Sequence, residues 1–402
     1  MKRWIALSLC MAMLAGCAGC GSNSSAAAEA GAPVQKDADA LQLPDALTVS
    51  DFAVKLLQNS DDTDNLLLSP MSVLCAAGML MNGAAGDTLS QLETAVGADT
   101  EALNGFASVW MNALQEKDGL LAANSVWLND AMLTAREPFL QKLHDVYGAE
   151  LFAQSFDADA LAALNRWCSE HTGGMVPELL KELPPDAIMY LVNALCFRKA
   201  WENPYKSSDV HEGTFTTESG SVQAAKMLTS TESIYLEDAS ATGFMKYYEG
   251  GQYAFAALLP AEGCPLQEFI AELDGQRISA LLSNASTESV SVRLPKFSVQ
   301  YSTELSDVFR TLGAADVFDE RKADLSGIGD DLYVSRILHK TFINVNETGT
   351  EAAAATAAEI MLKSMRPMRG KSVIFDRPFV YMIVDLETNI PVFIGTLTSL
   401  DG

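Results

Sequence analysis

The spacing of apolar residues predicts mainly helices in the first part of the chain. Apolar side chains recur with helical spacing over residues 45–58, 101–117 and 135–149. The segment "NLLLSPMSVLCAAGMLMNGAAGDTLSQLETAVG" (65–97) predicts a short strand, a buried helix that begins at Ser-Pro, and a turn that contains glycine.

Strand-like runs of apolar residues dominate the later part of the chain. They occur in "GLLAANSVWLND" (119–130), "AIMYLVNALCFRKAW" (187–201), "YAFAALLP" (253–260), "SVSVRLPKFSVQYS" (289–302) and the last 30 residues. Helices followed by strands predict an α+β fold with large antiparallel or mixed sheets, rather than a βαβ repeat. The 402 residues contain no internal repeat or interior linker, so one large domain and two smaller ones both fit the length.

The segment "NETGTEAAAATAAEIMLKSMRPM" (346–368) separates two strand-like runs and is rich in alanine. Alanine favours a helix, but residues 350–360 offer almost no large apolar side chain to dock one. A strand is the other interpretation, because its side chains alternate between two faces. Glu351 and Glu359 then share one face, and the other face carries no charge: Thr350, Ala352, Ala354, Thr356, Ala358 and Ile360. The two glutamates also share roughly one helix face, so a surface helix stays open as the alternative.

The first residues have the pattern of an export signal. A basic "MKR" precedes the short apolar stretch "WIALSLCMAML", which is too short to span a bilayer as a helix. The tetrapeptide Leu14-Ala15-Gly16-Cys17 resembles the bacterial lipobox, which implies a lipoprotein-type signal peptide over 1–16 and a lipid on Cys17; an ordinary secretion signal is the alternative. Residues 17–43 are expected to form a flexible tether, followed by the folded domain at 44–402.

Composition and charge exclude some classes of function. The formal net charge of −25 argues against nucleic-acid binding, which requires clustered Lys and Arg. The cysteines at 75, 168 and 196 lie in apolar contexts typical of core residues, so no disulfide framework is expected. The sequence contains no H-E-x-x-H, G-x-S-x-G, S-x-x-K or phosphate-loop motif. We therefore expect a protein that is not an enzyme and that binds no metal and no cofactor.

Five segments in order resemble the serpin family, from about residue 45 to the end. They are "NLLLSPMSVLCAAGMLMNGAAGDTLSQL", "LVNALCFRKAW", "RLPKFSVQYSTELSDVFRTLGAADVFDERKADLSGI", "ILHKTFINVNETGTEAAAATAA" and "DRPFVYMIVDLETNIPVFIGTL". The resemblance implies helices plus three β-sheets, with an exposed reactive-centre loop that can insert into the main sheet. It also implies a monomer that inhibits serine proteases as a suicide substrate and forms a covalent acyl-enzyme complex.

The resemblance assigns the loop and its hinge to residues 346–368. Its hinge residues are Glu347, Gly349, Thr350, Glu351, Ala352, Ala353, Ala354, Ala355 and Thr356. Small side chains suit a strand that must slide between two others, and Gly349 is expected to supply backbone freedom where the loop bends.

Family spacing from Gly349 places the scissile bond at Lys363–Ser364. Lysine suits trypsin-like pockets with a carboxylate at the base. Arg366–Pro367 is a poorer bond because proline restricts the leaving side. Elastase-like or chymotrypsin-like targets would instead use Met361, Leu362 or Met365.

The resemblance also marks residues in the main sheet. It implies a polar sheet-opening cluster of Ser69, Ser72, Asn193 and His339, and it places Trp201 at the top of the sheet, where insertion begins. A hydrogen-bonded cluster there could hold two strands closed and still release them. The alternative is that these are separate capping and core groups; Ser69, before a proline, is a plausible helix cap.

Two other classes of function stay open. A non-inhibitory serpin-fold surface binding protein would usually carry bulky or charged hinge residues, whereas Ala352–Ala355 are all alanine. A periplasmic-type binding lipoprotein is supported by the tether and the acidity alone. A hydrolase has the least support, because nucleophile motifs are absent.

Overall fold

The computed structural model describes residues 46–60, 65–114, 119–184, 187–350 and 370–401. The predicted signal peptide and tether lie outside this part of the chain, as do residues 351–369 of the loop. The described residues form helices and several β-sheets, and the predicted α+β class is confirmed. Within the described residues, no helix is both long enough and apolar enough to cross a bilayer.

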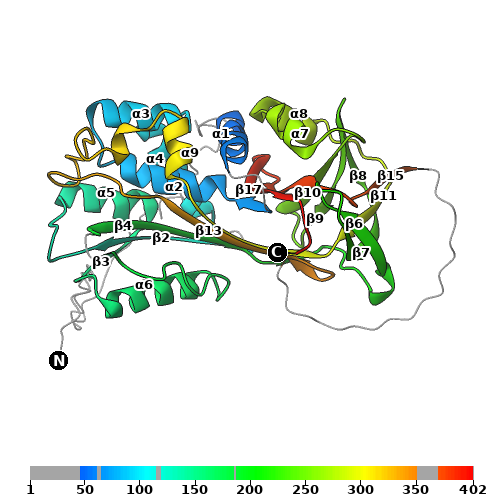
Figure 1. Cartoon of the computed structure of the whole chain (residues 1–402), viewed down its shortest axis with the longest axis horizontal. Helices are drawn as coiled ribbons and strands as arrows, with labels where there is room; N and C mark the ends of the chain where they lie inside the picture. The colour runs from blue at the N-terminus through cyan, green and yellow to red at the C-terminus, as the bar shows by residue number, and fades with distance from the viewer. Residues whose placement is uncertain (1–45, 61–64, 115–118, 185–186, 351–369, 402) are drawn as a thin grey trace, which may run out of the picture.

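Helices cover both faces of the main sheet, which contains β2, β4 and β13: α6 lies on one side, and α2, α4, α5 and α9 lie on the other (Figure 1). In the described residues the bounds are α1 Ala46–Asn59, α2 Pro70–Met81, α3 Gly86–Val96, α4 Thr100–Leu114, α5 Glu137–Tyr147, α6 Ala158–His171, α7 Leu266–Ala271, α8 Gly275–Ser283 and α9 Ser306–Thr311. α2 begins as the sequence predicts, because Pro70 occupies the first turn and Ser69 Oγ accepts a hydrogen bond from Ser72 N.

The strands include every strand-like run that the sequence predicts. Their bounds are β1 Leu66–Leu68, β2 Leu120–Leu128, β3 Glu150–Ala153, β4 Met189–Phe197, β5 Lys199–Ala200, β6 Val210–Thr216, β7 Val222–Glu232, β8 Ile234–Glu237, β9 Ala241–Tyr247, β10 Tyr253–Pro260, β11 Val290–Pro295, β12 Phe297–Glu304, β13 Leu338–Val345, β14 Gly349–Thr350, β15 Lys371–Ile374, β16 Phe379–Asp385 and β17 Ile390–Leu397.

The strands form three sheets, as expected. One has the order β1-β17-β16-β10-β9-β8, and a second has the order β15-β11-β7-β6. The main sheet consists of two hydrogen-bonded halves, β3-β2-β4 and β12-β13-β14-β5. Only Arg198 separates β4 from β5, so the two halves belong to one sheet that is joined at the β5–β14 end.

Two apolar clusters hold these layers together. The larger one surrounds the six-stranded sheet, whose strands β10, β16 and β17 are buried along their whole length. The smaller one lies between α6 and the main sheet and includes Trp127 of β2, Leu164 and Trp167 of α6, and Val192 of β4. The main sheet is therefore packed on both faces, and any change in its strand spacing must displace side chains on each side.

Candidate functional site

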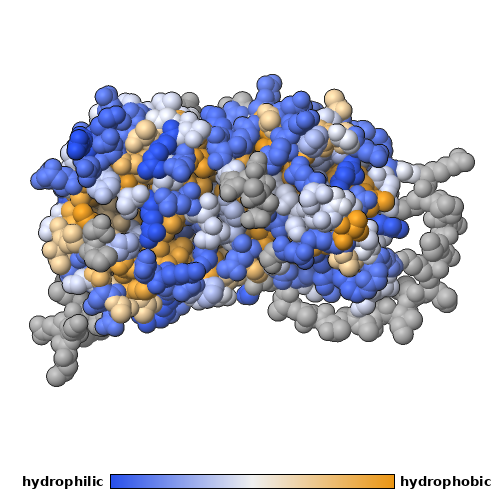
Figure 2. Space-filling model, viewed as in Figure 1, coloured by the Kyte–Doolittle hydropathy of each residue, from blue (hydrophilic) through white to orange (hydrophobic). Residues whose placement is uncertain are grey.

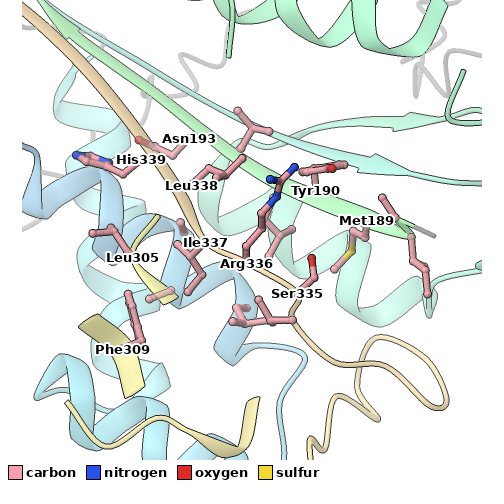
Figure 3. A pocket seen from close by; sticks show the side chains of 18 of the residues that line it. Met189, Tyr190, Asn193, Leu305, Phe309, Ser335, Arg336, Ile337, Leu338 and His339 are labelled. Atoms are coloured by element: carbon pink, nitrogen blue, oxygen red, sulfur yellow. The ribbon is translucent and has the colours of Figure 1, made fainter. Parts of the chain in front are cut away.

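The main sheet is open along most of the boundary between β4 and β13. No hydrogen-bonded pairing joins these two strands within the described residues, although they lie side by side. A cavity of about 450 Å³ lies at this boundary and is lined mainly by apolar side chains of α2, α9, β4 and β13 (Figure 3). Figure 2 shows apolar surface at the level of these strands. The strand β14 has only two residues and occupies only one end of the open boundary.

Three of the four residues in the expected sheet-opening cluster are linked by hydrogen bonds. Ser69 N donates to His339 Nε2 at 3.1 Å, and Ser72 N donates to Ser69 Oγ at 3.2 Å. Asn193 is bonded elsewhere, since its Nδ2 donates to Asn124 Oδ1 at 2.8 Å. The Asn193 Oδ1 atom is buried and has no hydrogen-bond partner among the described residues. His339 and Asn193 belong to the two strands that border the cavity, and Figure 3 shows both at one end of it.

His339 is held in its neutral form. Its ring is buried, and burial lowers the pKa of the imidazole to about 4. Its Nε2 accepts the hydrogen bond from Ser69 N, so the ring proton resides on Nδ1. Protonation of Nε2 would remove this bond between β13 and the start of α2.

Acid is therefore expected to destabilise the native protein through His339. The unfolded histidine has an ordinary pKa near 6.5 and binds more protons than the folded one between pH 6.5 and 4, so the free energy of unfolding falls as pH falls through that window. A lowering of the pKa from 6.5 to about 4 corresponds to about 3 kcal/mol. Urea unfolding of the wild type and of His339→Gln from pH 7 to 4.5 would measure it. We expect a smaller pH dependence in the variant, and equal dependence in both proteins would contradict the assignment.

Trp201 anchors the turn between β13 and β14. Its side chain is 1 % exposed and stacks on Tyr248, with ring centroids 4.5 Å apart. Its Nε1 donates to Asn346 O at 2.8 Å, and its backbone N donates to Thr348 O at 2.9 Å. The tryptophan therefore lies at the joined end of the main sheet and holds the start of the hinge.

Thr350 already occupies a strand position between β13 and β5. It lies opposite Val345 on one side and Lys199 on the other. Its side chain is buried, and its Oγ1 is 2.5 Å from the hydroxyl of Tyr248. Burial raises the pKa of Tyr248, which keeps that hydroxyl protonated and available for this bond.

Gly349 has a different role from the one expected. Its φ angle is not positive, so backbone freedom is not what requires glycine here. A Cβ atom would lie 2.2 Å from Lys199 O and 2.7 Å from Ala200 Cα. The absence of a side chain instead allows β14 to approach the backbone of β5.

Glu347 links the hinge to the connection between β11 and β12 through Lys296, whose Nζ lies 2.5 Å from Glu347 Oε2. The hydrogen bond from Lys296 lowers the pKa of this carboxyl. The backbone oxygen of Glu347 also accepts a hydrogen bond from Tyr205 N at 2.8 Å. The residues immediately before β14 are therefore fixed by both side-chain and backbone contacts.

A buried ion pair near the hinge was not predicted from the sequence. Lys246 is 4 % exposed, and its Nζ lies 2.8 Å from Glu232 Oε1. The same ammonium group lies 4.5 Å from the Tyr205 ring and 5.7 Å from the Trp201 ring. A lysine within the apolar run of β9 is the signal that could have indicated this pair.

Several expected site residues lie outside the described residues: Cys17, Glu351, Ala352, Ala353, Ala354, Ala355, Thr356, Lys363 and Ser364. In the part of the chain that the structure describes, no group of three or more His, Cys, Asp or Glu side chains could hold a metal ion.

Comparisons with known proteins agree with this geometry. Residues 47–400 match the family model described as "Serpin (serine protease inhibitor)". The chain is 31% identical to the leukocyte elastase inhibitor of Equus caballus, over 87% of this chain and 97% of that protein. The crystal structure of the thermophilic serpin tengpin in its native state has a TM-score of 0.82 and 38% identity, covering 88% of this chain and 94% of tengpin. The thyroxine complex of thyroxine-binding globulin shares the fold, with a TM-score of 0.78 at 24% identity and coverage of 89% and 99%.

Proposed function

The chain belongs to the serpin family, and on that premise we propose that it inhibits serine proteases by acting as a suicide substrate. The catalytic serine of the protease attacks the carbonyl carbon of Lys363. The peptide bond to Ser364 breaks, Ser364 leaves with a free amine, and Lys363 stays esterified to the protease. The chain contributes the substrate loop and the sheet that receives it, and it turns over no substrate of its own.

The position of Thr350 is the observation that carries this proposal. The strand that the loop would form has already begun, with Thr350 between β13 and β5. Below it, β4 and β13 have no hydrogen-bonded pairing in the described residues, and a cavity lies at their boundary. Residues that continue β14 could pair with both strands, and each new hydrogen bond would contribute about 1 kcal/mol net.

The length of the loop fits the transport of a trapped protease. Fourteen residue steps separate Gly349 from Lys363, and at about 3.3 Å per strand residue they reach roughly 46 Å. This is about the span of a domain of this size, so insertion would carry the acyl-linked protease from one end of the main sheet to the other. The native form must then be less stable than the inserted form and be held kinetically.

Trypsin-like proteases are the proposed targets, because Lys363 suits a pocket with a carboxylate at its base. Incubation with trypsin-like, elastase-like and chymotrypsin-like proteases, followed by denaturing gel electrophoresis and mass spectrometry, tests this choice. We expect a boiling-resistant adduct with a trypsin-like protease and a released peptide that begins at Ser364. Lys363→Ala should lose that adduct, whereas Lys371→Ala, a lysine beyond the loop, should keep it. Clean cleavage of the wild type with the protease left active would refute the inhibitory function.

The alternative is a non-inhibitory surface binding protein with the same fold. It predicts that no protease forms an adduct and that cleavage of the loop leaves thermal stability unchanged. Adduct formation, and the change in thermal stability on cleavage of the loop, therefore distinguish this alternative from an inhibitor.

We also propose that the protein is exported and that Cys17 carries a lipid, because residues 14–17 resemble a lipobox. Expression of the full chain in a bacterium fed a labelled fatty acid would show label in the wild type. Cys17→Ser should lose that label, whereas Cys20→Ser should retain it. An unlabelled wild type would favour an ordinary secretion signal.

A further inference from the structure

We propose that the cavity between β4 and β13 binds a single-chain amphipathic carboxylate, such as a medium-chain fatty acid, whose head group pairs with Arg336. Such a site goes beyond protease inhibition and consists of described residues alone. Binding at this cavity requires neither a protease nor cleavage of the chain, so its test is independent of the function proposed above.

The cavity has the size and the lining of a ligand pocket. Its volume of about 450 Å³ falls within the range of about 300–1,000 Å³ that small-molecule pockets span. Its walls are mainly apolar and come from several elements, for example Val73 of α2, Leu191 of β4, Phe309 of α9 and Ile337 just before β13. An apolar ligand would therefore be surrounded by side chains of elements that lie far apart in the sequence.

The cavity extends along the two strands. It is lined by β4 from Met189 to Asn193 and by the neighbouring segment from Ser335 to Lys340. The steps from Met189 to Asn193 span roughly 13 Å at about 3.3 Å per strand residue. A volume spread over this length suits an extended alkyl chain better than a compact ring system.

The charges around the cavity favour an anion. Among the described residues that line it, Arg336 and Lys340 carry a positive charge, and none is an Asp or a Glu. His339 also lines the cavity, but it is neutral because burial lowers the pKa of its ring to about 4. This positive lining contrasts with the net charge of −25 of the whole chain, and it would attract an anionic ligand and repel a basic one.

Arg336 is the cation that is available to a ligand. The Nζ atom of Lys340 already donates to the backbone oxygen of Glu178, whereas the side chain of Arg336 makes no hydrogen bond or ion pair within the described residues. Arg336 is half-buried at the cavity, and Figure 3 shows its guanidinium extending toward Tyr190. A carboxylate placed there would accept two parallel charge-assisted hydrogen bonds from the guanidinium.

The cavity reaches the surface beside Arg336. Tyr333 is 45% exposed and Ser335 is also exposed, and both line the cavity on the segment that precedes β13. Deeper in the cavity, Ala77 of α2 and Leu305 are buried. A ligand that enters with its chain first would bury the chain and keep its head group at the half-buried guanidinium.

A single available guanidinium favours a monoanion with one chain. A phosphate head group would bring a second negative charge to a protein whose net charge is already −25, and Arg336 would neutralise only one of the two. A cavity of about 450 Å³ that extends along two strands also takes one alkyl chain rather than the two chains of a diacyl lipid. The ligand class is therefore a free carboxylate with a single chain.

The apolar walls predict that affinity depends on chain length. Each methylene group that the cavity removes from water should tighten binding by about fourfold. Affinity should therefore increase along the series acetate, hexanoate, octanoate and decanoate. Equal affinity for acetate and decanoate would contradict an apolar chain site.

Isothermal titration calorimetry of the full chain with monomeric decanoate tests the role of Arg336. We expect one decanoate to bind per chain, and Arg336→Gln to weaken binding by about tenfold or more, because it removes the charge and the paired donors. Arg321→Gln, at an exposed position that does not line the cavity, should bind decanoate as the wild type does. Decan-1-ol has the same chain without the charge and should bind the wild type about tenfold more weakly than decanoate.

A second variant, Ala76→Phe, tests the chain site without changing the charge. Ala76 lines the cavity from α2, so a phenyl ring there would occupy the space that the chain needs, and decanoate binding should be lost. Equal decanoate affinity in the wild type and in either Arg336→Gln or Ala76→Phe would overturn the site. Tighter binding of decyl phosphate than of decanoate would overturn the carboxylate head group. No protease takes part in these titrations, so their failure would leave the proposed inhibition of proteases standing.

Discussion

Replacing Thr350 with arginine should convert the proposed inhibitor into a protease substrate. Thr350 is 1 % exposed and lies between β13 and β5, with its Oγ1 bonded to Tyr248. An arginine there would bury a guanidinium with no carboxylate facing it, and an unpaired buried charge costs several kcal/mol. The rest of the loop could not follow into the sheet, so hydrolysis of the acyl-enzyme would outpace insertion.

The measurement is the number of inhibitor molecules consumed per protease molecule inactivated. We expect this ratio to rise by about tenfold or more, which corresponds to about 1.4 kcal/mol or more between the two fates of the acyl-enzyme. Thr350→Val provides the control, because it keeps the shape and lack of charge and loses only the bond to Tyr248. If Thr350→Arg and Thr350→Val inhibited equally well, insertion through this position would not be part of the mechanism.

The sequence was sufficient for those features that depend on local patterning. The Ser69-Pro70 start of α2 follows from capping chemistry, and the buried strands β10, β16 and β17 follow from uninterrupted apolar runs. The buried position of Thr350 agrees with the alternation read from the alanine-rich segment. The strands β6–β9 were not predicted individually, because their alternation is weaker and their pairing depends on partners distant in the chain.

Features set by long-range geometry could not be read from the sequence. Position 349 requires glycine because a Cβ atom there would lie 2.2 Å from Lys199 O of β5, and no local pattern indicates this contact. The bonding of Asn193 to Asn124, rather than to the other cluster residues, depends on the register that places Asn124 of β2 directly opposite Asn193 of β4.

Removing one member of the buried pair of Lys246 and Glu232 should strongly destabilise the folded protein. The side chains are 4 % and 12 % exposed, and their charged atoms lie 2.8 Å apart. Lys246→Met would leave the carboxylate of Glu232 nearly buried without its partner, and removing one member of such a pair costs about 3–5 kcal/mol. The ammonium also lies over the ring of Tyr205, whose backbone N holds Glu347 at the base of the hinge. We therefore expect both lower stability and a looser hinge.

Urea unfolding of single and double variants would measure this cost. Lys246→Met should lower the free energy of the first unfolding transition by the amount given above, and Lys246→Met combined with Glu232→Leu should recover most of it, because no charge is then left buried. Lys226→Met is the matched control: its ammonium pairs with Glu212, but the side chains are 60% and 75% exposed, so its loss should cost less than about 1 kcal/mol. Equal losses for Lys246→Met and Lys226→Met would mean that water reaches Glu232 when its partner is removed. The pair of Lys246 and Glu232 would then be solvated, and it would not help to position Tyr205 for its hydrogen bond to Glu347.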